Sequence, residues 1–114
     1  MSHEVPLRVL VERRGALPVV HVFGEMDMCT VHQAEQPLRH ELAAPPPALV
    51  LDLLDVTFID AAGMRMLVDA RSAAHRTETD LRVALPRVVL RPLSILGLSD
   101  GFAMYGTVAD AVAA

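Results

Sequence analysis

The sequence predicts a single α/β domain in which a mixed sheet of about five strands carries about four helices, mostly on one side. The chain has 114 residues, the length of one ordinary domain. Two strand-like runs open the chain, and strand and helix patterns then alternate, an order that favours a mixed sheet covered by helices. Only three Phe and one Tyr occur among 53% hydrophobic residues, so the core must be aliphatic. We expect one domain over residues 1–114, with its core between about residues 7 and 113.

The first two elements form a predicted hairpin. Residues 7–12 and 17–23 are rich in β-branched and other apolar side chains. Gly15 lies in the short segment between them, where it can supply the turn. Residues 24–27, Gly-Glu-Met-Asp, end the second strand.

A helix is expected next, from about residue 31 to residue 43. Thr30 and Gln33 have the spacing of a capping box at its start. Pro37 falls inside the pattern and removes one backbone hydrogen bond, so we expect a kink or an irregular turn there. Three consecutive prolines then stop the helix.

The middle of the chain contains the strongest strand pattern. Residues 48–53 are apolar at nearly every position, as in a strand that is covered on both faces. Residues 56–59 then lead the chain to Asp60, a natural N-cap for a second helix over about residues 61–75. Met64, Leu67, Val68 and Arg71 are expected on one stripe of that helix, at helical spacing.

The last third repeats the alternation. Residues 81–85 alternate as a strand does, and residues 87–96 are typical of a helix that ends at Gly97. A short strand over residues 102–105 and a short helix over residues 107–113 complete the chain. The last helix again begins with a capping pattern.

Composition argues against several classes of function. The formal net charge is −4, and the ten basic residues, all Arg, are scattered, so no basic stripe is available for nucleic acid. The start of the chain lacks the pattern of a signal peptide, and no apolar run approaches the ~20 residues of a membrane span. A single cysteine, Cys29, cannot form an internal disulfide and fits a reducing compartment. We therefore expect a cytoplasmic protein without membrane insertion.

No constellation of residues indicates catalysis, a cofactor or a metal. The serines lie in no Gly-x-Ser-x-Gly context, and no phosphate-binding loop occurs. Cys29 and His32 form one Cys-x-x-His pair, but a zinc site needs four ligands and no second pair matches it. Cys29 is either a redox-sensitive thiol or, as we expect, a small buried apolar residue. The sequence therefore predicts no enzyme, no catalytic residues, no cofactor and no metal site.

Three stretches resemble the STAS domains of bacterial anti-sigma-factor antagonists. Residues 24–27 resemble the Gly-Glu-Leu-Asp that closes the second strand of that family. Residues 51–64 include Leu-Asp-Leu and Val-Thr-Phe-Ile-Asp-Ala-Ala-Gly-Met, and they resemble its central strand, loop and helix start. Residues 93–98 with Phe102 resemble its closing Leu-x-x-x-Gly-Leu…Phe. The resemblance runs from about residue 9 to residue 113.

The resemblance implies a binding module whose partner is an anti-sigma factor of the serine-kinase type. Family members sequester that partner and so free a sigma factor, until the kinase phosphorylates a Ser or Thr between the Asp and the Gly of the loop. A helix N-terminus there tolerates the added anion, which then disfavours the contact. Carried onto this chain, the partner-binding loop and its degenerate phosphosite consist of Asp27, Thr57, Asp60, Ala61, Ala62, Gly63 and Met64.

The chain departs from the family at the phosphosite itself. Ala61 and Ala62 occupy both positions between Asp60 and Gly63, and neither can accept a phosphoryl group. The protein is then permanently competent to bind, is regulated in another way, or serves a different partner. The hydroxyls of Thr57 and Thr30 lie nearby and could accept the phosphoryl group instead, although we expect Thr57 to be a loop residue that bonds to local backbone.

The sequence also allows other roles for some of these residues and other functions for the chain. Asp27 and Asp60 are expected near each other at one end of the sheet, as helix caps or turn formers, as partner contacts, or as both. Met28 and Met64 either fill the core or lie in the partner surface. The alternative functions are an accessory subunit of a transporter ATPase and a self-associating, ligand-binding scaffold, and a homodimer is possible.

Overall fold

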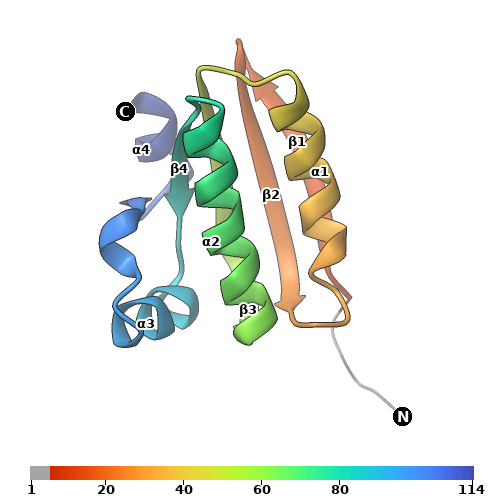
Figure 1. The fold of residues 1–114 in the computed structure, drawn as a ribbon, viewed down its shortest axis with the longest axis vertical. Helices are drawn as coiled ribbons and strands as arrows, with labels where there is room; N and C mark the ends of the chain where they lie inside the picture. The colour runs from red at the N-terminus through yellow and green to blue at the C-terminus, as the bar shows by residue number, and fades with distance from the viewer. Residues whose placement is uncertain (1–5) are drawn as a thin grey trace.

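The computed structural model describes residues 6–114 and contains one five-stranded sheet, in the order β1-β2-β3-β4-β5 (Figure 1). β1 (Arg8–Arg14) runs antiparallel to β2 (Leu17–Met26). β2, β3 (Ala48–Ile59), β4 (Asp80–Ala84) and β5 (Ala103–Tyr105) are parallel, each to its neighbour. The predicted mixed sheet is confirmed. The absence of a signal peptide was a prediction about residues that lie largely outside the described part of the chain.

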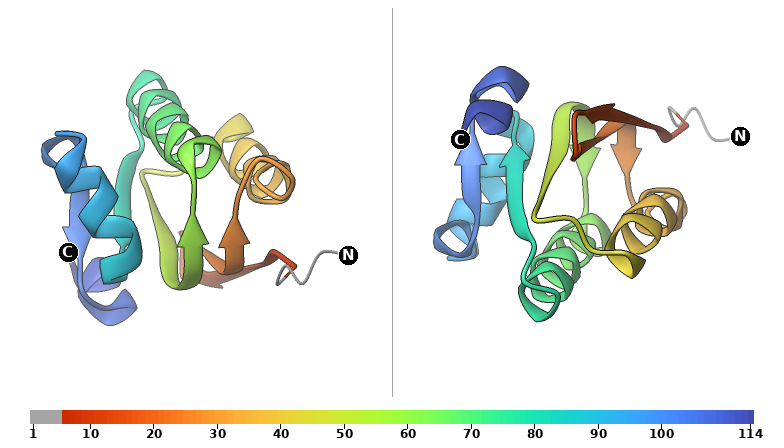
Figure 2. Two further views of the ribbon diagram at one scale, coloured as in Figure 1. Left: turned by 90° about the horizontal axis from the view of Figure 1, so that it is seen from below. Right: turned by 90° about the horizontal axis from the view of Figure 1, so that it is seen from above.

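Four α-helices cover the sheet unequally. They are α1 (His32–Ala43), α2 (Ala61–Arg76), α3 (Arg87–Ile95) and α4 (Val108–Ala113), with a 3₁₀ turn at Ser99–Gly101. α1, α2 and α3 contribute to a large core on one face of the sheet, whereas α4 lies against the other face (Figure 2). The prediction that the helices lie mostly on one side is therefore confirmed.

The central strand β3 shows why its sequence is apolar at nearly every position. Leu49, Leu51 and Leu53 face the large core, while Val50 packs with Val19 against α4. Because the strand is covered on both faces, alternation is lost, as expected for a central parallel strand. The core is aliphatic, as the composition predicts.

β3 is longer than predicted. Residues 56–59 are part of the strand and not a loop, so Thr57 is a strand residue. The register between β2 and β3 shifts twice, between His21 and Phe23 and again between Gly24 and Glu25. These irregularities allow the two strands to stay paired up to Met26 and Ile59.

The start of α1 differs from the prediction. Thr30 and Gln33 form no capping box, and the helix begins at His32 without a side-chain cap. The Thr30 hydroxyl instead donates to the Glu25 carbonyl at 2.6 Å, and Asp27 accepts from two backbone N–H groups of the turn. Asp27 therefore caps the turn before the helix. At Pro37, where we expected a kink or an irregular turn, no irregular turn forms, since α1 continues as a helix through this residue.

The other caps and turns agree with the sequence. Gly15 and Gly97 have positive φ angles of 66° and 71°, in the hairpin turn and after α3. The side chains of Asp60 and Thr107 cap α2 and α4. Met64 and Leu67 of the predicted stripe on α2 are buried. Val68 and Arg71 of the same stripe are only half-buried.

Candidate functional site

Two aspartates follow neighbouring parallel strands, at the end of the sheet where the carboxyl ends of these strands lie. Asp27 follows β2 and Asp60 follows β3, and the last residues of these strands, Met26 and Ile59, are paired. The Asp60 N–H donates to the Met26 carbonyl at 3.1 Å, which joins the two loops. This end of the sheet is the lower one in Figure 1, where α2 begins. The predicted proximity of the two loops is confirmed.

Both carboxylates are used by the backbone. The Oδ1 atom of Asp60 accepts from the Gly63 N–H at 3.1 Å, and its Oδ2 atom accepts from the Met28 N–H at 3.2 Å. The Oδ1 atom of Asp27 accepts from the N–H groups of Cys29 and Thr30 at 2.9 and 3.1 Å. The two side chains therefore act as a helix cap and a turn former, and Asp60 keeps no oxygen free of protein contacts for acid–base work.

Gly63 permits α2 to begin directly against β2 and β3. A Cβ atom at this position would lie 2.6 Å from Cγ1 of Ile59 and 2.8 Å from the carbonyl oxygen of Met26. Real Cβ atoms do not approach backbone atoms so closely, so the position requires glycine. Met64 is also buried, with 6% of its surface exposed, and belongs to the core. These two residues shape the site from within.

The exposed part of the site is small and weakly polar. Ala61 is exposed and Ala62 is half-buried. The side chain of Met28 is 77% exposed, and its backbone N–H donates to Asp60, the residue that precedes Ala61. We call Met28, Asp60, Ala61 and Ala62 the Asp60 surface. Phe58, which the sequence reading did not single out, is 46% exposed near the end of β3. Only its position directly before the motif Ile-Asp could have drawn attention to it.

The remaining polar candidates fall into different environments. Thr30 is buried, and its hydroxyl is held by Glu25 and Asp27, whereas Thr57 is exposed. Cys29 is exposed, so its expected role as a buried apolar residue is wrong. It lies in the turn between β2 and α1. Within residues 6–114, no group of three or more His, Cys, Asp or Glu side chains is arranged so that it could hold a metal ion.

A cluster missed by the sequence analysis lies on the face of the sheet opposite α1 and α2. The His21 ring contacts Asp52 through Nδ1 at 2.5 Å and Glu12 through Nε2 at 2.7 Å. Burial alone would lower the pKa of His21, but the hydrogen bonds to Asp52 and Glu12 outweigh it and raise that pKa above its ordinary value. The hydrogen bond from His21, together with Arg14, lowers the pKa of Glu12. These side chains come from three adjacent strands, so only knowledge of the register could have found them.

This cluster predicts a pH-dependent contribution to stability. A histidine with a raised pKa in the folded state contributes stability below its unfolded pKa of about 6.5, and loses it as pH rises through the folded pKa. His21→Gln is therefore expected to lower the free energy of unfolding by about 1–3 kcal/mol at pH 6 and by less at pH 9. Urea unfolding across this range tests it, with His75→Gln, an exposed position, as the control. An equal loss at both pH values would contradict a charged His21.

Comparison with known proteins decides the family. Residues 8–111 match the family model of the STAS domain. The chain belongs to the STAS domain family. This STAS domain is 29% identical over 112 residues to the anti-sigma-F factor antagonist RsfB of Mycobacterium tuberculosis, covering 98% of this chain and 92% of that protein.

Solved structures agree with this assignment. The crystal structure of an anti-sigma factor antagonist from Mycobacterium paratuberculosis matches with a TM-score of 0.82 and 32% identity, over 94% of this chain and 92% of that one. A sulfate transporter family protein from Wolinella succinogenes matches with a TM-score of 0.72 and 17% identity, over 86% of this chain and 83% of that one. The second likeness shows the fold alone. Within residues 6–114, no helix of this STAS domain is long and apolar enough to cross a membrane.

Proposed function

We propose that this STAS domain is an anti-sigma-factor antagonist that binds and sequesters an anti-sigma factor of the serine-kinase type and so releases a sigma factor. The observation that carries the proposal is the Asp60 surface, formed at the start of α2 within the family's motif. Two similar proteins, from Mycobacterium tuberculosis and Mycobacterium paratuberculosis, are described as anti-sigma factor antagonists. Such a partner acts in the cytoplasm, where we place this protein.

The chemistry of the Asp60 surface suits recognition of a protein. Met28 offers a flexible thioether, which adapts to varied apolar contacts. Ala61 and Ala62 leave the first turn of α2 open to close approach by a partner. The carboxylate of Asp60 holds its loop in place through backbone hydrogen bonds, so the surface is formed before binding and less ordering is needed.

The same chemistry gives no support to catalysis. Asp60 is engaged through both oxygens, and Asp27 is 9% exposed and bonded to its own turn. A wide, open hollow of about 800 Å³ lies elsewhere, between β1 and α1. We therefore propose a non-enzymatic role without cofactor or metal.

The proposal includes a permanently binding-competent state at this site. Ala61 and Ala62 carry no hydroxyl for the kinase to modify. Thr30 cannot replace them without leaving its buried hydrogen bonds, and Thr57 is in a strand rather than at the helix start. Phosphorylation by the bound partner is therefore not expected to end the interaction.

A pull-down of the tagged protein from its own cell lysate, with the recovered proteins identified by mass, tests the proposed partner. Recovery of a kinase-like anti-sigma factor, with the bait unmodified after ATP is added, is the expected result. Recovery of a transporter ATPase in its place would overturn the function and leave the fold standing. A second bait with the substitution Ala109→Glu, on α4 and away from the Asp60 surface, controls for a change in surface charge alone.

A further inference from the structure

The sheet has one long edge that is open to pairing. β1 stands first in the strand order and, within residues 6–114, pairs only with β2. It has seven residues, contains no proline, and runs in unbroken register along β2. β5 at the opposite edge has only three residues. An open edge of this length presents N–H and C=O groups to which a further strand can bond.

β1 combines exposed apolar residues with charges. Leu10 is 58% exposed and Val11 is 36% exposed. Charged side chains often protect an edge from association, and β1 contains three arginines and one glutamate. Arg13 pairs with Glu41. Glu12 contacts both Arg14 and His21, in each case through Oε1. Arg8 has no ion-pair partner among the described residues. The guanidinium group of Arg8 is therefore available for an ion pair with another molecule.

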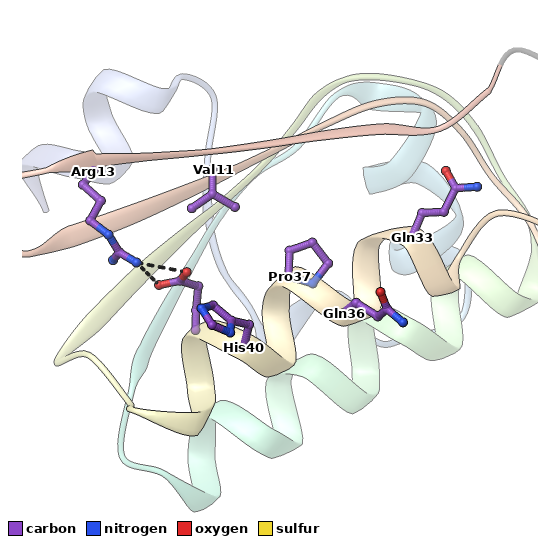
Figure 3. A pocket seen from close by; sticks show the side chains of 7 residues that line it. Val11, Arg13, Gln33, Gln36, Pro37 and His40 are labelled. Carbon is purple, nitrogen blue, oxygen red and sulfur yellow. Dashed lines mark hydrogen bonds and ion pairs between the residues drawn. The ribbon is translucent and has the colours of Figure 1, made fainter.

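The alternation of β1 assigns its side chains to two faces. Leu10 and Glu12 lie opposite His21 and Val19, on the face of the sheet away from α1. Arg8, an even number of residues from both, lies on the same face. Val9 packs toward the large core, and Val11 lines the open hollow between β1 and α1 (Figure 3).

We infer that β1 pairs antiparallel with β1 of a second copy of this chain, about a two-fold axis at Leu10, to join the two sheets into one. In this register Leu10 faces Leu10 of the second copy, and Val9 faces its Val11. Arg8 faces Glu12 of the second copy, and the symmetry makes this pair twice. Opposite charges and apolar pairs across strands each stabilise such an arrangement. No two arginines face each other.

The charges also reject the neighbouring symmetric register. With the axis at Val11, Arg8 would face Arg14 of the second copy, twice, and Leu10 would face Glu12. Like charges directly opposite each other destabilise a strand pair. The hollow between β1 and α1 is lined by Val11 and Arg13 of β1 and by residues of α1, and the Arg13–Glu41 ion pair joins the two elements there (Figure 3). A second copy is therefore favoured by the pattern of β1 itself.

This inference goes beyond the proposed function, because the Asp60 surface and β1 belong to different elements and a monomer can still bind an anti-sigma factor. One strand edge buries little area, so the dimer is expected to be weak, with a dissociation constant on the order of 100 µM. Sedimentation of the full chain from about 10 µM to 1 mM should show reversible dimerisation. A chain that remains monomeric throughout overturns the inference, whatever the result of the pull-down.

A charge swap tests the register. Arg8→Glu alone and Glu12→Arg alone should each weaken self-association at least about tenfold, because each places like charges opposite each other twice. Mixing the two variants should restore dimers, since one chain then supplies two acidic residues and the other two basic ones. Arg91→Glu, an exposed change on α3, is the matched control and should leave dimerisation unchanged. Circular dichroism confirms that each variant is folded. A dimer that is insensitive to both single changes, or variants that fail to associate when mixed, would overturn the pairing.

Discussion

Ala62→Glu is expected to weaken binding of the anti-sigma factor by about 100-fold or more, without loss of the fold. Ala62 occupies the second position of α2, on the Asp60 surface, and is half-buried. The positive end of the helix dipole lies at the N-terminus of α2 and stabilises a carboxylate there. The free energy of unfolding should therefore be unchanged or slightly increased. In the complex, the new charge would lose water without gaining a partner, and a 100-fold loss corresponds to about 2.7 kcal/mol. Titration calorimetry with the purified anti-sigma factor measures it.

The chain supplies a matched control for this substitution. Ala109 is also the second residue of a helix with a side-chain cap, but that helix, α4, packs against the other face of the sheet. Ala109→Glu should therefore repeat the change in charge and in helix dipole and leave the affinity within about twofold of the unmodified chain. If Ala62→Glu binds as well as this control, the Asp60 surface is not where the partner binds.

Gly63→Ala is expected to lower the free energy of unfolding by about 2 kcal/mol. Alanine is better than glycine inside a helix by about 1 kcal/mol, but the added methyl group would meet backbone and side-chain atoms of Met26 and Ile59 at 2.6 to 3.1 Å. Overpacking of this kind costs about 1–3 kcal/mol beyond any gain, because backbone atoms must move. The displacement would fall at the start of α2, so partner binding should weaken as well.

Urea unfolding measures the effect of Gly63→Ala. Gly106→Ala is the control, because a Cβ atom there would meet no heavy atom within 4 Å and the residue does not have a positive φ angle. We expect a change of less than about 0.5 kcal/mol for the control. A comparably small change at Gly63 would mean that α2 does not begin against β2 as the structure has it.

Much of this fold follows from local patterns in the sequence. Continuous apolar residues predict β3, because a central parallel strand is covered on both faces, and Asp60 predicts the start of α2 because few residues can cap a helix. The start of α1 was harder to predict. Asp27 and Thr30 are both able to accept backbone hydrogen bonds, and the outcome depended on the Glu25 carbonyl, which lies at the end of β2.

The relative position of the two aspartates could be predicted from the sequence. Asp27 and Asp60 were expected at one end of the sheet, and the structure places them there. Local spacing could not show that Met64 belongs to the core while Met28 is exposed, because that depends on how α2 lies on the sheet. The contacts of His21 with Glu12 and Asp52 required the register of three strands, which no local pattern specifies.

The most direct test of the account is the affinity of the full-length protein for a purified anti-sigma factor of the serine-kinase type, measured with and without Mg-ATP. We predict the same dissociation constant in both conditions and no gain in mass by the unmodified chain. Ala62→Ser, which restores a hydroxyl between Asp60 and Gly63, should gain one phosphoryl group and lose affinity. Absence of binding by the unmodified chain, or its phosphorylation and release on addition of ATP, would contradict a permanently competent antagonist.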